Sequence, residues 1–164
     1  MPALDLIDET YLVAEPATVA ARIRDPELWR TWWPALHLSV YQDRGEQGLR
    51  WTVTGTLVGS SEIWLEPCRD GVLLHYYLRA ELTGRGSDTE VMTGRQARVR
   101  RRALAAGRRH SAELKRALNA LKDELEAGRP PGTPRPGTDA PPADSRPATT
   151  TGVKTGAGTA EGKA

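Results

Sequence analysis

Residues 95–127 read RQARVRRRALAAGRRHSAELKRALNALKDELEA, and this stretch decides the fold. It contains leucines spaced i, i+4, i+7 and i+11, which places them on one face of an α-helix: Leu114, Leu118, Leu121 and Leu125. The same stripe continues backwards through smaller residues: Ser111, Gly107 and Leu104, with Ala103 and Ala106 beside it. A helix with one long apolar stripe is not stable alone in water, so the sequence requires a broad surface for this helix to lie on.

The residues before the helix predict that surface. Apolar and polar residues alternate with a period of two, which predicts strands at 36–43, 48–58, 60–67 and 72–82. Short turns separate these segments, so we expect an antiparallel meander with one buried face. Between the meander and the helix, both Ser87–Glu90 and Thr93–Gln96 match a capping box, and we favour the second as the start of the helix.

The first 35 residues predict a strand and two short helices. Residues 3–13 form the strand, with Asp5, Asp8 and Glu9 turned towards solvent. Pro16 and Pro26 suit the first turns of the two helices, where a missing N–H costs nothing. The first helix buries Val19, Ala20 and Ile23, and Asp25 caps the second. The fold class is therefore α+β.

Composition divides the chain into one domain, residues 1–127, and a tail, residues 128–164. The tail is dominated by Pro, Gly, Thr and Ala, so we predict that it is disordered. No apolar run is long enough for a transmembrane helix, and the acidic N-terminus is unlike a signal peptide. Cys68 is the only cysteine, which excludes an internal disulfide and a cysteine-cluster metal site. We expect a cytoplasmic protein.

Three segments together resemble a known superfamily. They are VAEPATVAARIRDPELWRTWWP (13–34), EIWLEPCRDGVLLHYYL (62–78) and LKRALNALKDELE (114–126). Their order and spacing resemble the START-like, polyketide cyclase/dehydrase and lipid-transport superfamily. The resemblance implies a helix-grip fold, in which a curved antiparallel sheet wraps the C-terminal helix around a cavity for an apolar small molecule. The sequence departs from the pattern because only five strands are evident and a hairpin is missing between Asp43 and Leu49, so we expect a smaller sheet and a more open cavity.

The resemblance and the stripe together predict binding of a hydrophobic small molecule, such as a lipid or a polyketide-like compound. Small residues in the N-terminal half of the helix would leave space opposite the sheet, unless large side chains fill it. Trp32 and Trp33 are candidates to guard the cavity mouth. The predicted ligand-binding residues are Trp33, Trp51, Val53, Leu57, Ile63, Leu65, Leu74, Tyr76, Leu78, Leu104, Gly107, Ser111 and Leu114.

A cyclase or dehydratase is the enzyme alternative, which the resemblance allows. Its weak catalytic candidates are His110, as a general acid or base, and Tyr76, which could orient a ligand; ordinary packing is an equally open role for Tyr76 and the commoner one for His110. The three histidines have no metal-ligand spacing, and we expect neither a metal nor a cofactor. Trp64, between Glu62 and Glu66, is predicted on the outer face of the sheet.

The charge distribution raises a third possibility, an interaction protein. Residues 1–84 carry 7 basic and 12 acidic side chains, whereas residues 85–122 carry 11 basic and 3 acidic. The arginines of the helix are at 95, 98, 100, 101, 102, 108 and 109. Without a recognised nucleic-acid module, a solvated face or attraction of an anionic ligand is favoured over specific DNA or RNA binding. A weak contact with a membrane surface stays open.

Overall fold

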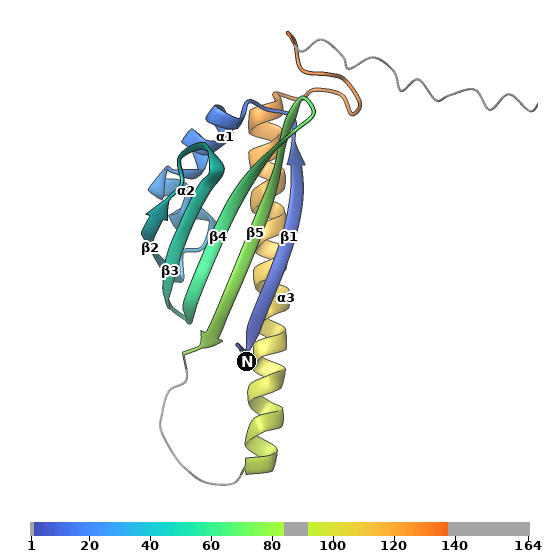
Figure 1. Cartoon of the computed structure of the whole chain (residues 1–164). Helices are drawn as coiled ribbons and strands as arrows, with labels where there is room; N and C mark the ends of the chain where they lie inside the picture. The colour runs from blue at the N-terminus through green and yellow to red at the C-terminus, as the bar shows by residue number, and fades with distance from the viewer. Residues whose placement is uncertain (1, 84–91, 138–164) are drawn as a thin grey trace, which may run out of the picture.

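The computed structural model describes residues 2–83 and 92–137, with the backbone alone at 92–97. Figure 1 shows a curved sheet with helices packed against it. The elements in chain order are β1 (Leu4–Leu12), α1 (Pro16–Ile23), α2 (Pro26–Trp32), β2 (Leu36–Asp43), the 3-10 turn η1 (Gly45–Gln47), β3 (Gly48–Gly55), β4 (Leu57–Cys68), β5 (Gly71–Leu82) and α3 (Met92–Glu126). This is the expected α+β helix-grip.

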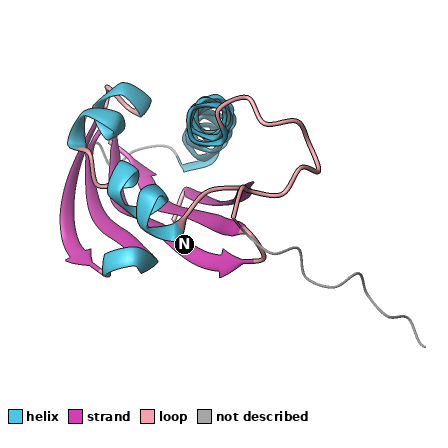
Figure 2. Cartoon of the chain, turned by 90° about the horizontal axis from the view of Figure 1, so that it is seen from above, coloured by secondary structure: helices cyan, strands magenta, loops and turns pink. Residues whose placement is uncertain are grey.

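The sheet has five antiparallel strands in the order β1-β5-β4-β3-β2. Strands β2 to β5 form the predicted meander, and β1 pairs with β5 along its whole length. The short turn η1 stands where the sequence lacked a hairpin. Figure 2 shows the long helix α3 end-on, on the concave side of the sheet.

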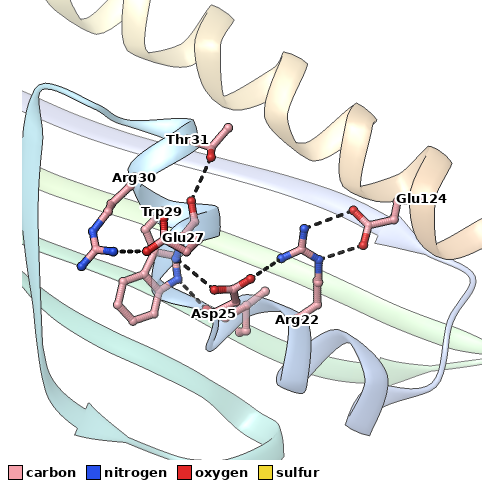
Figure 3. A network of polar contacts seen from close by, with 8 residues as sticks. Arg22, Asp25, Glu27, Trp29, Arg30, Thr31 and Glu124 are labelled. Atoms are coloured by element: carbon pink, nitrogen blue, oxygen red, sulfur yellow. Dashed lines mark hydrogen bonds and ion pairs between the residues drawn. The ribbon is translucent and has the colours of Figure 1, made fainter.

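The two short helices form as their prolines and apolar residues predict. Val19, Ala20 and Ile23 of α1 are buried, and Asp25 Oδ1 accepts the backbone N–H of Glu27 at 2.9 Å as the cap of α2. Arg22 then joins α1 to α3, because its guanidinium pairs with Asp25 at 3.0 Å and with Glu124 at 2.8 Å (Figure 3). The buried apolar residues of both helices belong to the same core cluster as those of the sheet.

The long helix α3 buries its leucine stripe against β1 and the core. Leu114, Leu118 and Leu121 are almost completely buried, and Leu125 packs against them. The N-terminal part of α3 extends past the end of the sheet (Figure 1). The helix begins at Met92, so Thr93 lies within it and is not the cap that we predicted. The other capping box, Ser87–Glu90, lies outside the described residues.

Two predictions about the strands were wrong. The chain turns after Gly55, where φ is +112°, so Leu57 and Val58 begin β4 and do not end β3. A glycine adopts this backbone conformation without the steric cost that a side chain would add. Asp8 does not share a face with Asp5 and Glu9, because alternate residues of a strand point to opposite faces. It points to α3 and pairs with Lys115 at 2.7 Å.

Two arginines near the start of the predicted tail contact the domain. Arg135 pairs with Glu15 at 2.5 Å, and its backbone N–H donates to Asp70 at 3.1 Å. Arg129 donates to the carbonyl oxygen of Val13 at 3.4 Å. Residues 138–164 lie outside the described part of the chain. Among the described helices, none is long and apolar enough to span a membrane.

Candidate functional site

A cleft of about 340 Å³ opens between α3, the loop after α2 and the turn between β3 and β4. Its position follows from the fold, because the loop after α2 and the start of β4 meet the middle of α3 at this end of the sheet. Apolar side chains make most of its wall, and Arg109 and Glu113 contribute the charged groups. It is lined by Trp33, Pro34, Ala35, Leu36, Thr56, Leu57, Leu82, Ala106, Arg109, His110 and Glu113.

Three aromatic side chains are packed together at the inner wall of this cleft. The imidazole of His110 stacks on Trp33, with ring centroids 5.4 Å apart and an angle of 14° between the planes. Its Nε2 lies 2.7 Å from the hydroxyl oxygen of Tyr76, so these two groups share a hydrogen bond. Trp33 also packs on Tyr76 at 5.5 Å. The cluster joins the helix, the sheet and the loop after α2.

Burial sets the protonation of this cluster. Desolvation lowers the pKa of His110 to about 4, because a buried imidazolium loses its hydration. Desolvation also raises the pKa of Tyr76 above its ordinary value. At neutral pH both groups are therefore uncharged, and His110 Nδ1 is the ring nitrogen not engaged with Tyr76. The inner wall of the cleft is aromatic and neutral.

The structure distributes the predicted site residues over three places. Trp33 and Leu57 line the cleft, as does the catalytic candidate His110. A larger group is buried in the single apolar core cluster beneath it: Trp51, Val53, Ile63, Leu65, Leu74, Tyr76, Leu78 and Leu114. Trp29 packs edge-on against Trp51 at 5.1 Å within this core cluster. Ser111 is half-buried beside this core.

Leu104 and Gly107 do not reach the cleft. Leu104 is 58% exposed, and Ala103 takes the inward position, so the prediction that Leu104 faces the sheet was wrong. The reason is that a residue 10 positions before Leu114 does not lie on the same face of a helix with 3.6 residues per turn. A side chain added at Gly107 would meet Leu4 and Leu6 of β1 at 3.9 Å, which is ordinary packing distance.

Sequence reasoning missed most of the cleft wall. Pro34, Ala35 and Thr56 belong to loops, and Leu36 and Leu82 to the ends of strands, so no periodic pattern connects them. Ala106 was noted only as a neighbour of the stripe, and Arg109 only as one of seven arginines. Helical spacing could have found these two, since both lie one residue before an inward position, Gly107 and His110 respectively.

The outer face of the sheet carries a second cluster of polar and aromatic groups. His75 is buried there, with its ring nitrogens 3.0 Å from Glu9 and 3.1 Å from Glu66. Trp64 stacks on His75 with centroids 4.6 Å apart, which confirms its predicted place on the outer face. Among the described residues, no group of three or more His, Cys, Asp or Glu could hold a metal ion.

A larger hollow, of about 870 Å³, lies at the other end of α3. Its wall combines Tyr11, charged side chains of α3 such as Lys122, and the proline-rich residues 130–134. Lys122 and Glu126 pair with each other there at 2.5 Å. Six of the thirteen residues that line this hollow are charged, against two of the eleven that line the cleft, and we therefore take the cleft as the candidate site.

No family model matches the sequence, and it has no significant match among curated proteins. Solved structures share its fold. A Deinococcus radiodurans protein of known crystal structure aligns with a TM-score of 0.52 and 13% identity, over 77% of this chain and 100% of that one. A START superfamily protein from Mycobacterium smegmatis aligns with a TM-score of 0.47 and 13% identity, over 74% and 98%.

The fold is a helix-grip, a curved antiparallel sheet against a long C-terminal helix. The Aha1 dimer from Colwellia psychrerythraea also aligns with this chain, with a TM-score of 0.47 and 12% identity over 77% and 99% of the two chains. At these identities the likeness concerns the fold alone. The function of this domain has to be argued from its own cleft.

Proposed function

We propose that the protein binds a small apolar molecule, such as part of a lipid or a polyketide-like compound, in the cleft beside α3. The observation that carries this proposal is the neutral aromatic wall of Trp33 and His110 within a cleft otherwise lined by Leu57, Leu82 and Ala106. Ligand sites are concave and mostly apolar, with a few fixed polar groups, and volumes of roughly 300–1,000 Å³. The cleft is at the small end of that range, so it suits one ring system or a short chain.

The close packing of the core favours a ligand position in the cleft over one enclosed at the centre of the domain. Trp51 and Tyr76 fill the centre with almost no exposed surface, and interiors of this kind are close-packed. A ligand at the centre would have to displace several large side chains. A ligand in the cleft would occupy space that the side chains leave open.

The test uses a neutral fluorescent probe, N-phenylnaphthylamine, whose emission rises in an apolar site. Ala106 lines the cleft and is half-buried, so Ala106→Trp should fill the site and abolish the rise that the wild type gives. The matched control is Ala105→Trp, since Ala105 is the neighbouring residue on α3 and is exposed. It should bind the probe as the wild type does. Equal binding by both variants, or no binding by the folded wild type, would reject the cleft as a ligand site.

A second candidate, a cyclase or dehydratase, is favoured by the hydrogen bond between Tyr76 and His110. In the tautomer whose Nε2–H donates to the Tyr76 oxygen, Nδ1 carries the lone pair that would accept a proton from a bound carbon acid, as a weak base because burial lowers the pKa of His110 to about 4. The test is ring closure or dehydration of a poly-β-ketone mimic by the wild type and by His110→Gln. Turnover that His110→Gln abolishes, while the variant still binds N-phenylnaphthylamine, would establish an enzyme. No turnover by the wild type would leave binding alone.

A further inference from the structure

We propose that the cleft selects amphiphiles: molecules whose apolar part enters the cleft and whose anionic group, a carboxylate, phosphate or sulfonate, lies against Arg109 at the rim. This inference rests on the proposed function, because it names the ligand class of the same site. It adds a charge requirement that an apolar cleft alone does not imply.

The rim of the cleft is positively charged. Arg109 is exposed and lines the cleft, and within the described part of the chain its guanidinium has no ion-pair partner. Glu113 is the only acidic residue among the described residues that line the cleft. A guanidinium with free N–H groups is suited to bidentate binding of a carboxylate, phosphate or sulfonate.

The positive charge continues along the same side of α3. Arg98 and Arg102 precede Arg109 by 11 and 7 residues, which places all three within an arc of roughly 40° on an ideal helix. Both are exposed. From Arg98 to Ala112 the sequence contains six arginines and no acidic residue, so Glu113 is outweighed along this side. The field at the rim therefore attracts an anion.

The inner wall fixes the orientation of such a ligand. His110 and Trp33 present neutral aromatic surface, and an anion placed there would lose its hydration without gaining a counter-charge. At the rim the anion stays in contact with water and gains Arg109. The inner wall thus favours the apolar part of an amphiphile, and the rim favours its anionic group.

The experiment compares two probes that differ by one charged group. Anilinonaphthalene sulfonate has the ring systems of N-phenylnaphthylamine and carries an added sulfonate. We expect the wild type to bind the sulfonate more tightly, and Arg109→Gln to weaken the sulfonate about tenfold, in line with the loss of one charge-assisted contact. Binding of the neutral probe should change less than about twofold, because Arg109 makes no charge contact with it.

Arg108→Gln is the matched control. It removes the same charge from the neighbouring residue, which is exposed and does not line the cleft. We expect it to weaken the sulfonate by about twofold or less, through the general field alone. Equal losses in the two variants, or no preference of the wild type for the sulfonate, would overturn the inference while leaving neutral-probe binding intact. If neither probe binds the folded wild type, the proposed function itself fails.

Discussion

His110 affects both the stability of the fold and the chemistry of the candidate site. Its imidazole is buried against Trp33 and bonded to Tyr76, and burial holds its pKa at about 4, below the ordinary 6.5. The folded protein therefore resists protonation at a pH where the unfolded chain already accepts the proton. The contribution of His110 to the free energy of unfolding is therefore present above pH 6.5 and is lost as the pH falls towards 4.

We predict that the free energy of unfolding falls by about 2 kcal/mol between pH 7 and pH 4.5 because of this one group. Urea denaturation at a series of pH values measures the effect. His110→Gln, which cannot take up a proton, should flatten the profile over this range. His37→Gln is the control, because His37 is exposed and should leave the profile unchanged. Identical slopes for the wild type and His110→Gln would contradict the assignment.

The hydroxyl of Tyr76 provides a separate prediction. Tyr76→Phe keeps the buried ring but leaves His110 Nε2 without its partner at 2.7 Å. An unpaired buried polar group costs about 1–3 kcal/mol, so we expect a loss of that size in chemical denaturation. Tyr77→Phe is a suitable comparison, since Tyr77 is on the outer face and is only half-buried. A neutral effect of Tyr76→Phe would show that water or another group replaces the hydroxyl.

At the scale of the element, α3 has two kinds of leucine. Leu118 is fully buried, whereas Leu104 is 58% exposed, beyond the reach of the core. We predict that Leu118→Ala lowers the free energy of unfolding by about 2–5 kcal/mol, through lost burial and the cavity left behind. Leu104→Ala should change it by about 0.5 kcal/mol or less. A large loss for Leu104→Ala would mean that its side chain is covered in solution.

Gly107 tests how closely α3 lies on β1. Because an added Cβ would meet Leu4 and Leu6 at 3.9 Å, the space accepts a methyl group without displacement. Alanine is favoured over glycine within a helix by about 1 kcal/mol, so Gly107→Ala should raise the melting temperature. Calorimetry measures this directly. A lower melting temperature would indicate that α3 and β1 approach each other more closely than the structure has them.

At the scale of the whole molecule, the contacts of Arg129 and Arg135 extend beyond the domain boundary that we propose at residue 127. They join residues 129–135 to Val13, Glu15 and Asp70 at the end of the sheet. These are polar contacts of a segment without buried apolar side chains. Such pairs contribute about 1 kcal/mol or less each.

Two truncations separate this segment from the rest of the tail. A chain ending at Gly137 keeps the contacts, and we expect its melting temperature to equal that of the full-length protein. A chain ending at Gly128 loses them, and its free energy of unfolding should fall by about 1 kcal/mol. Thermal melts of the three proteins give the comparison. A drop of several degrees on removing residues 138–164 would instead place those residues in contact with the domain.

The sequence by itself determined the architecture of this protein. The leucine stripe from Leu114 to Leu125, the period-two segments from Leu36 onward and the prolines at the helix starts are local signals of secondary structure. Each predicted the type of its element, but the boundary between β3 and β4 was wrong at Leu57 and Val58. The number of strands and the burial of Val72, Leu74 and Leu78 followed for the same reason. Local periodicity is visible in a sequence because backbone geometry repeats over a few residues.

Only the tertiary structure decided where the cleft lies. Its wall joins Ala35, Thr56, Leu82 and Arg109, which are distant in sequence and share no period. Whether small residues leave a void also depends on what fills the space opposite, and here Trp29 and Trp51 close the centre while the end of the sheet stays open. Packing is a property of segments that meet in space, so no single stretch of the chain could have revealed it.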